Sequence, residues 1–588
     1  KSFNFYTSTW RVDPFTLERI EVLRGPSAML YGQGTTAGVV NMVSKRPLDE
    51  RHGEVGVQLG SWGRKQLQTD LTGPLTEDGT WLYRIIAVGR DADTQVDYVS
   101  DDRLLLAPSL TWRPSARTAV TLLASWQRDR TGSSSQFFPW AGTVSPNPNG
   151  RIATDRFIGD PNRDRYDTDH AHLGWTLEHE FSERWSIHQN VRYMRNDVEY
   201  RSVYGDPFTT PGAFDADPVN QRILGRNWYG SSTSVHMLSA DQFIEGKFST
   251  GPISHDVIMG ADIVRYRQTG KSAFDFPDYQ GGGVPSIDVY APIYGSYVPP
   301  DLMRDPDSTI RQSGVYLHDQ MRFATNWIVV AGLRHDRARN STEGNPTERS
   351  SATSKRFGLL YAFENGVSPY VSYSESFTPQ ANMGSQSFDP KRGKQWETGI
   401  KYEVPGKGLF LGANLYDLKE RNRIEEVAPN VFQQLGKTST RGAELELRGA
   451  LTRNVDIEAH YNYTDADEQL EELPKHQAAV WAKWRFALAE TPGFSVGAGA
   501  RYFSGFADGA APRVPSVTLF DAMLAWENSR WRVALNGAEA VAPDVLRAFC
   551  SRFARWGFDA RALTPVYGLS EAALAVTFSD LEQPYRTR

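Results

Sequence analysis

The sequence predicts an all-β fold, an antiparallel transmembrane β-barrel of the 22-stranded type. Three observations predict it. Apolar and polar residues alternate in many runs between about residues 52 and 535, which is the period of a strand with two unlike faces. No window approaches the ~18 consecutive apolar residues that a membrane-spanning helix requires. Short connections also coexist with long ones rich in Gly, Pro, Asn and Asp, as in barrels with short turns at one rim and long loops at the other.

Composition narrows the class further. Of the 588 residues, 40% are hydrophobic and 23% are charged, so the chain can bury enough apolar surface to fold. The formal net charge of −6 is too balanced for a nucleic-acid-binding surface, and we expect no nucleic-acid partner. The single cysteine, Cys550, excludes a disulfide framework and a cysteine-based zinc or iron–sulfur site.

The alternating runs are long enough to cross a membrane. They include 173–181, 455–463 and 480–486, with similar runs near 54–60, 81–89, 118–126, 315–323, 357–363, 409–416 and 496–502. A tilted membrane strand needs about 9–11 residues, whereas strands of a soluble sandwich, the alternative, have about five or six. Tryptophans at run ends predict interfacial girdles, with ordinary core aromatics as the alternative; they are Trp81, Trp112, Trp126, Trp327 and Trp526.

The connections set the strand count. The long ones are expected at 128–170, 201–234, 268–311 and 376–395, and tight ones near Gly73-Pro74 and 113–115. About 484 residues shared among 22 strands leave roughly 22 residues for each strand and its connection, in the range of plugged barrels.

Residues 13–47 carry short apolar strands and many glycines. Their motifs are Asp13-Pro14, Leu17-Glu18-Arg19, Arg24-Gly25-Pro26, Leu30-Tyr31-Gly32, Gly38 and 41–47, and later ones are 373–377, 393–399, 441–446 and Pro474-Lys475-His476. With these residues the chain resembles the TonB-dependent siderophore receptors, in particular the ferrichrome and ferrioxamine-like group, over about residues 1–536. The resemblance implies the C-terminal part of a plug domain at 1–51, a barrel at 52–536 that lacks its last strand, and a separate tail at 537–588.

The same resemblance implies a function. We expect a monomeric receptor in the outer membrane of a Gram-negative bacterium, in contact with outer-membrane lipid, that takes up ferric siderophores, hydroxamates being favoured. The iron is then cargo, and we expect no cofactor, catalytic residue or resident metal. The TonB energy-transducing complex is the implied partner, and we expect its contact segment and a signal segment to be missing from this chain. The alternatives are a passive porin-like channel and a non-functional fusion.

Two barrel glutamates are candidates for contact with the plug. Alternation places Glu397 on the face opposite Trp396, and Glu444 on the face opposite Leu445, so both glutamates are expected in the lumen. The resemblance implies that they pair with plug arginines, and Arg24 matches one of these arginines. Buried charges are tolerated only when they are paired. We interpret Arg24, Glu397 and Glu444 as a plug–barrel latch; solvated lumen charge is the alternative.

Aromatic residues in the long connections are the candidate ligand site. A compact ferric chelate needs aromatic edges and a few hydrogen-bond donors in a concave region. The segment 133–140 resembles the aromatic loop of the family, and the candidate ligand-binding residues are Phe137, Phe138, Trp140, Tyr204 and Phe274. Membrane-interface aromatics are an equally good interpretation. His170 and His172 share a strand face without a third ligand nearby, so we expect no metal site there.

The period of the sequence changes near the C-terminus. Pro543-Asp544 opens an apolar pattern that ends at Gly557, which predicts a short helix. Residues 536–580 resemble a fragment of an adenylate-forming enzyme through the motif 567–571. A phosphate-binding loop is absent upstream, so we expect no adenylation and interpret 537–588 as a foreign tail. The run 574–578 could substitute as a closing strand, but its alternation is too short to predict one.

Overall fold

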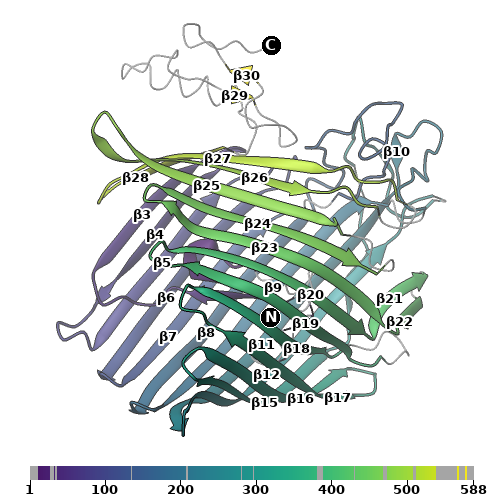
Figure 1. The fold of residues 1–588 in the computed structure, drawn as a ribbon. Coiled ribbons are helices and arrows are strands. Elements are labelled where there is room, and N and C mark those ends of the chain that lie inside the picture. Colours follow the sequence, from purple (N-terminus) through teal and green to yellow (C-terminus); the bar gives the residue numbers. More distant parts are fainter. Residues whose placement is uncertain are drawn as a thin grey trace.

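The computed structural model describes residues 11–26, 32, 36, 38–133, 136–206, 210–279, 281–295, 297–380, 388–428, 431–467, 473–507, 511–537, 566–567 and 577–578. Most of these residues form one closed β-barrel, which confirms the predicted fold class (Figure 1). No helix in the described part of the chain is long and apolar enough to cross a membrane.

The barrel wall follows chain order. It consists of β3 (His52–Leu59), β4 (Lys65–Pro74), β5 (Trp81–Asp91), β6 (Asp101–Ser115), β7 (Thr118–Thr131), β8 (Arg165–Ser182), β9 (Trp185–Gly205), β11 (Arg226–Thr250), β12 (Ile253–Asp275), β14 (Met303–Arg304), β15 (Ser308–Phe323), β16 (Trp327–Thr342), β17 (Glu348–Tyr361), β18 (Val367–Thr378), β19 (Lys391–Val404), β20 (Leu409–Arg421), β23 (Thr438–Thr452), β24 (Val455–Ala466), β25 (His476–Leu488), β26 (Thr491–Phe503), β27 (Val517–Glu527) and β28 (Arg532–Gly537).

The contact that closes the ring differs from all others. The two-residue β14 precedes β15 along the same edge of β12, so the two act as one interrupted strand. Every other step from β3 to β28 reverses direction, which leaves β3 and β28 running the same way. The closing contact is therefore parallel, and it involves strands of only eight and six residues.

Register identifies the lumen-facing side chains. Gly32 lies so close to the barrel that a Cβ there would sit 2.6 Å from the guanidinium of Arg334, so Arg334 faces the lumen. Tyr316 and Gly260 continue this face on the neighbouring strands. The residues next to them in sequence point outward and expose apolar side chains; examples are Met259 (55%), Leu317 (49%) and Leu333 (50%).

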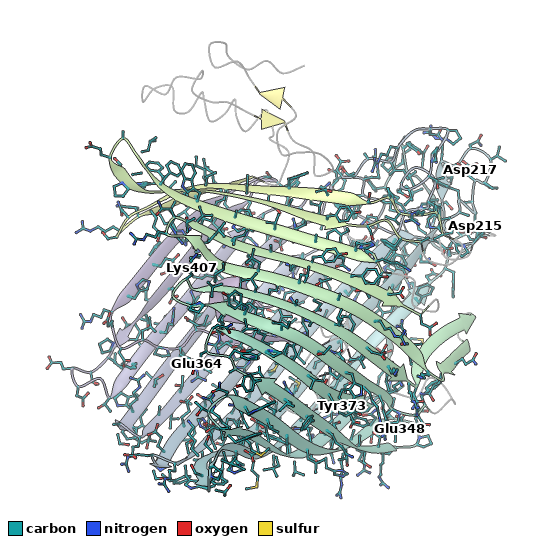
Figure 2. The ribbon with its side chains drawn as sticks, viewed as in Figure 1. Asp215, Asp217, Glu348, Glu364, Tyr373 and Lys407 are labelled. Carbon is teal, nitrogen blue, oxygen red and sulfur yellow. The ribbon has the colours of Figure 1, made fainter. Side chains whose placement is uncertain are left out.

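Aromatic residues gather near the short turns. Trp81 stacks on Trp112 with ring centroids 5.9 Å apart, and Trp327 contacts Tyr361 at 4.8 Å. Figure 2 marks this rim by residues of two short turns, Glu364 and Lys407, and the opposite rim by Asp215 and Asp217 of a long loop. The clustering agrees with the predicted girdle.

The strands are longer than the sequence pattern indicated. β9, β11 and β12 have 21, 25 and 23 residues, so the long connections reduce to 132–164, 206–225, 276–302 and 379–390. The wider predicted loops were wrong because a strand that rises beyond the apolar layer carries charge on its outward face, so the apolar-outward alternation ends before the strand does. Tyr204 and Phe274, expected in loops, consequently lie on β9 and β12.

Three of these connections pack into one body, which we call the loop cap (residues 136–164, 210–225 and 281–295). It includes the short pair β10 (Ile223–Leu224) and β13 (Ile287–Asp288). Its buried core consists of Ile152, Ile158, Phe214, Leu224, Ile287 and Val289. The cap is thus a packed structure and not a set of independent loops.

Two further pairs lie outside the wall. β21 (Arg423–Ala428) pairs with β22 (Val431–Leu435). β29 (Val566–Tyr567) pairs with β30 (Thr577–Phe578), so these last residues do not join the barrel as a closing strand. The predicted helix and most of the 567–571 motif lie outside the described residues.

Candidate functional site

A two-stranded hairpin contacts the lumen side of the wall. This lumen hairpin is formed by β1 (Leu17–Arg24) and β2 (Gly38–Ser44), which pair antiparallel, and a short 3₁₀ turn (Pro14–Thr16) precedes it. Pro14 fixes the backbone at the start of that turn, and the side chain of Asp13 accepts the amide of Phe15 at 3.0 Å.

Buried ion pairs hold both ends of the hairpin to one side of the barrel. Asp13 lies 2.9 Å from Arg103 of β6, which also binds Asp129 of β7 at 2.7 Å. Lys45 lies 2.8 Å from Asp70 of β4. Four of these charged side chains are almost completely buried: Asp13, Arg103, Asp129 and Asp70. Buried charges of this kind are stable only while they are fully paired.

The tip of the hairpin reaches the other side of the barrel. The guanidinium of Arg24 donates to Glu444 of β23 at 3.0 Å and lies 3.8 Å from Glu446. Arg24 is 41% exposed, so this pair is weaker than the buried ones. The next residue, Gly25, has φ +72°, and a Cβ there would collide with Gln395; glycine therefore permits this close approach.

Glu397 contacts other residues of the barrel wall. It faces the lumen as predicted, but its carboxylate accepts the hydroxyl of Tyr370 at 2.5 Å and the amide of Gln395 at 3.0 Å. Among the described residues Arg24 forms its ion pairs with Glu444 and Glu446 and not with Glu397. All three predicted latch residues line one cavity of about 530 Å³ between hairpin and wall.

An aromatic surface lines the lumen near the rim with the long loops. Tyr166 of β8 and Tyr200 of β9 meet with ring centroids 5.5 Å apart, and Tyr200 lies 5.9 Å from Tyr229 of β11. Phe274 of β12 is the register partner of Tyr229. We call these four residues the aromatic wall. Two of its tyrosines, Tyr166 and Tyr229, were missed because they fall within the expected loops 128–170 and 201–234; Tyr200 lies one residue before the second loop and was not singled out.

The predicted ligand residues divide into two groups. Phe137 contacts Tyr204 at 5.5 Å and is 36% exposed, and both lie beside the upper edge of the aromatic wall. Phe138 packs against the core of the loop cap. Trp140 packs on Gly212, where a Cβ would overlap the indole. The structure therefore brings Phe137, Tyr204 and Phe274 toward the lumen and uses Phe138 and Trp140 inside the loops.

The lumen surface around the aromatic wall is uncharged. From the level of His170 to the rim, no described lumen-facing residue of β8, β9, β11 or β12 is Asp, Glu, Lys or Arg. These residues are Tyr166, Thr168, His170, Asn196, Val198, Tyr200, Ser202, Tyr204, Asn227, Tyr229, Ser231, Thr233, Val235, Gln268, Gly270, Ser272 and Phe274. The outward face of the same segments is rich in charge; it carries Arg165, Asp167, Asp169, Asp197, Glu199, Arg201, Arg226, Lys271 and Asp275.

An apolar patch lies directly below. Val235, Met237, Val264 and Tyr266 form a buried cluster on the lumen side of β11 and β12. His170 and His172 lie on the same face of β8 with ring centroids 6.1 Å apart. No group of three or more metal-ligating side chains occurs in the described part of the chain. The surface as a whole can contact a compact ligand through rings, hydroxyls and amides.

A plugged barrel with an aromatic extracellular vestibule is the architecture of an outer-membrane transport receptor, and comparison with known proteins identifies the family. The family model "TonB dependent receptor-like, beta-barrel" matches residues 111–538, and the model "TonB-dependent Receptor Plug Domain" matches residues 2–39. The first covers well over half of the chain.

Curated relatives agree. The chain is 33% identical over 552 residues to the ferrioxamine B receptor of Salmonella typhimurium, covering 90% of this chain and 76% of that protein. It is 32% identical over 565 residues to the ferrichrome outer membrane transporter/phage receptor of Escherichia coli K12, covering 90% and 74%.

Solved structures share the fold. The siderophore receptor PiuA of Acinetobacter baumannii superposes with a TM-score of 0.79 at 21% identity, covering 90% of this chain and 83% of that one. The ferric-catecholate import receptor Fiu of E. coli K12 gives 0.77 at 22%, covering 89% and 82%.

The chain belongs to the TonB-dependent receptor family. It is an outer-membrane transport receptor of the Gram-negative type and not an enzyme.

Proposed function

We propose that this receptor takes up ferric siderophores and that it prefers uncharged, hydroxamate-type chelates. The curated relatives named for ferrioxamine and ferrichrome support the first part. The observation that carries the second part is the uncharged lumen surface around the aromatic wall.

Charge balance connects this surface to the ligand class. Three hydroxamates each carry a single negative charge and together neutralise one ferric ion. Three catecholates each carry a double negative charge and leave their ferric complex a trianion. A trianion desolvated against tyrosines, serines and a buried apolar cluster, with no arginine or lysine on the lumen side of these strand segments, loses its hydration without compensation. A neutral chelate loses far less, and the rings of Tyr229 and Phe274 supply contact area.

The lumen hairpin supports a transport mechanism. The iron is cargo and remains held by its siderophore, so the protein has to bind, orient and release a whole chelate. We propose that Arg24, Glu397 and Glu444 act as a plug–barrel latch, with Arg24 on Glu444 directly and Glu397 holding Tyr370 and Gln395 beside it. The buried pairs of Asp13 and Lys45 then remain fixed while the half-exposed latch opens.

The proposal extends to the partners and the tail. Uptake through this family's mechanism depends on the TonB energy-transducing complex, and the receptor is proposed to act as a monomer. We propose no adenylate-forming activity for residues 537–588, since the 567–571 motif is not accompanied by a phosphate-binding loop.

The test is transport into iron-starved cells that lack other siderophore receptors and express this chain. Radiolabelled ferrichrome, which is neutral, should accumulate inside, and uptake should stop when the TonB complex is deleted. Accumulation that persists without the TonB complex would instead establish the second candidate, a passive porin-like channel.

A further inference from the structure

A carboxylate, that of Asp305, borders the aromatic wall. Asp305 lies in the short link 305–307 between β14 and β15. Its backbone amide donates to the carbonyl of Gly270 at 3.0 Å, and its carboxylate accepts the hydroxyl of Ser272 at 2.6 Å. The side chain of Ser272 belongs to the uncharged lumen surface of β12. The carboxylate of Asp305 therefore lies on the lumen side of the wall.

Register places this carboxylate just below two of the rings. Ser272 precedes Phe274 by two positions on the same face of β12, and Phe274 is the register partner of Tyr229. Two residues of a strand span about 7 Å. The hydroxyl that holds Asp305 is thus about one such step from the rings, toward the short-turn rim. A chelate that rests on the rings has Asp305 within reach of a short, flexible arm.

Asp305 has no cation opposite it. It forms no ion pair within the described ranges, whereas Asp307, two positions along the chain, pairs with Arg267 at 3.0 Å and with Arg304 at 3.2 Å. The hydroxyl of Ser272 satisfies one oxygen of the carboxylate and leaves its charge uncompensated. A lumen carboxylate in this state can accept a cation from a ligand.

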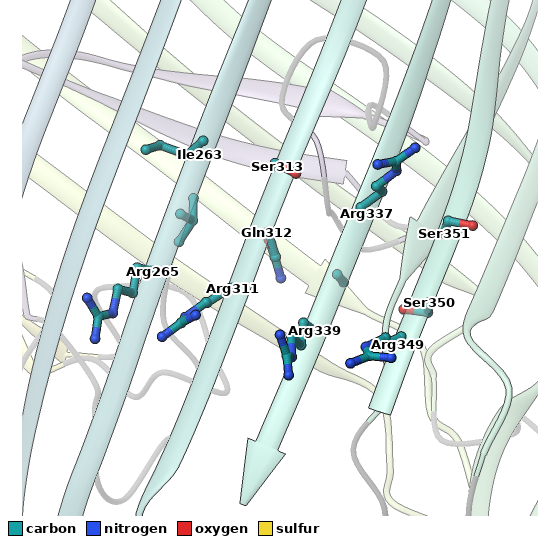
Figure 3. A pocket seen from close by; sticks show the side chains of 12 residues that line it. Ile263, Arg265, Arg311, Gln312, Ser313, Arg337, Arg339, Arg349, Ser350 and Ser351 are labelled. Carbon is teal, nitrogen blue, oxygen red and sulfur yellow. The ribbon is translucent and has the colours of Figure 1, made fainter. Parts of the chain in front are cut away.

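Arginines of the neighbouring wall face the other way. Figure 3 shows Arg265, Arg311 and Arg339 side by side on β12, β15 and β16, where the register makes them partners. Each lies an even number of positions from an exposed apolar residue of its own strand; these residues are Ile263, Leu317 and Leu333. The three arginines therefore lie on the outer face, and the wall separates them from Asp305.

A buried hydroxyl beside the rings is also unsatisfied. Ser202 of β9 is the register partner of Tyr229 and is 1% exposed. Its hydroxyl has no hydrogen-bond partner in the part of the chain that the structure describes. Because a buried polar group without a partner costs free energy, this side of the aromatic wall favours a ligand that brings hydrogen-bond donors.

We propose that Asp305 binds a protonated amine on the arm of a ferric trihydroxamate whose iron-binding centre rests on the aromatic wall. A carboxylate and an ammonium group form a charge-assisted hydrogen bond, and the faces of the Tyr229 and Phe274 rings attract a cation near them. The inference rests on the proposed function and refines it: the chelate centre is uncharged and its arm is cationic. The same carboxylate repels a trianionic tricatecholate.

The test compares two ferric trihydroxamates that differ only at the arm. Ferrioxamine B ends in a primary amine, which is protonated at about pH 7, and its N-acetyl derivative ends in a neutral amide. Each is titrated against the purified full chain with tryptophan fluorescence quenching as the readout. We expect wild type to bind ferrioxamine B about tenfold more tightly than the acetyl derivative. In D305N both chelates should bind with the affinity that the acetyl derivative has for wild type.

The matched control is D307N. Asp307 faces outward, where it pairs with Arg267 and Arg304, so D307N should keep the wild-type preference for ferrioxamine B. If D305N fails to insert, ionic strength provides the comparison on wild type. Raising it from about 0.05 M to about 0.5 M should remove most of the preference, because salt screens a partly hydrated ion pair. The affinity for the acetyl derivative should stay the same.

The outcomes separate this inference from the proposed function. Equal affinity of wild type for the two chelates, or a preference that survives in D305N or at high ionic strength, would overturn the role of Asp305 and leave the proposed function standing. Loss of the preference in D307N would assign it to the general charge of the rim, and the site would be wrong. Failure of both chelates to bind wild type would overturn the proposed function and this inference together.

Discussion

Arg24 of the lumen hairpin and Glu444 of β23 meet at 3.0 Å although 420 residues separate them in the chain. The hairpin thus bridges two sides of the barrel. At Asp13 and Lys45 its ion pairs are buried, and at Arg24 the pair is half-exposed. A partly hydrated ion pair contributes little to stability, whereas breaking a buried, fully paired one is costly. The Arg24 contact is therefore the one expected to open first.

Removing the latch carboxylates should make the barrel leak. In E397Q/E444Q, Arg24 loses its direct partner and Tyr370 loses the carboxylate that accepts its hydroxyl. We expect a clear rise in ion conductance across planar bilayers with the protein still inserted. The control is E403Q on the same strand and the same face as Glu397, which should conduct like wild type. Equal conductance of E397Q/E444Q and wild type would remove the latch from the account.

Arg103 should matter more for stability than either of its partners. Replacing it in R103Q leaves Asp13 and Asp129 buried without a cation, a change that typically costs about 3–5 kcal/mol. D13N leaves the Arg103–Asp129 pair intact and should cost less. Amide hydrogen exchange of residues 13–24 measures both, and we expect fast exchange in R103Q and an intermediate rate in D13N. The reverse order would show that the hairpin is not anchored at Arg103.

The aromatic wall should contribute directly to ligand affinity. We expect Y229A and F274A each to weaken binding of a neutral ferric trihydroxamate by roughly tenfold, because each removes a ring worth about 1 kcal/mol beyond its buried area. The matched control is Y193A, on β9 but on its outward face, where the side chain is 46% exposed. Binding unaffected by Y229A and F274A but lost in Y193A would place the ligand elsewhere.

The loop cap should loosen in acid. Burial by itself raises the pKa of Asp288, but hydrogen bonds from Arg222 and from the amides of Tyr290 and Ala291 outweigh it and hold the pKa below its ordinary value. A carboxylate of lowered pKa stabilises the fold above its unfolded pKa, and this contribution is lost as the pH falls through the lower, folded value. Arg222 and Asp288 join 210–225 to 281–295, at 2.8 Å.

The measurement is limited proteolysis of these loops at pH 6 and below pH 4. We expect protection at pH 6 to be lost only below about pH 4, the ordinary range for Asp. In D288N, protection should be reduced at both pH values and should no longer depend on pH in this range. Strong acid dependence in D288N would assign the effect to another group.

The barrel could be predicted from sequence where one strand face meets lipid. Alternation placed Glu397 and Glu444 in the lumen opposite Trp396 and Leu445, and the structure agrees, since Trp396 and Leu445 are 55% and 51% exposed. Tyr166, Tyr200 and Tyr229 could not be found in this way. They lie on strand ends beyond the apolar layer, where the outward face is charged and the apolar-outward alternation that marks the lipid-facing wall is lost.

Contacts between residues far apart in sequence could not be predicted from the sequence either. The pairing of Asp13 with Arg103 depends on which strand the hairpin meets, and no local pattern encodes that. Phe138 and Trp140 share composition with Phe137 but pack within the loop cap. Resemblance identifies an aromatic loop; only the fold separates rings that face the lumen from rings that hold the loop together.

Equilibrium binding of two ferric chelates, one neutral and one negatively charged, tests the central claim most directly. The purified chain is titrated with neutral ferrichrome and with a trianionic ferric tricatecholate at the same ionic strength, and tryptophan fluorescence quenching is followed. The uncharged lumen surface around the aromatic wall predicts tight binding of ferrichrome and binding of the tricatecholate at least about a hundredfold weaker. Equal or tighter binding of the trianion would contradict the account.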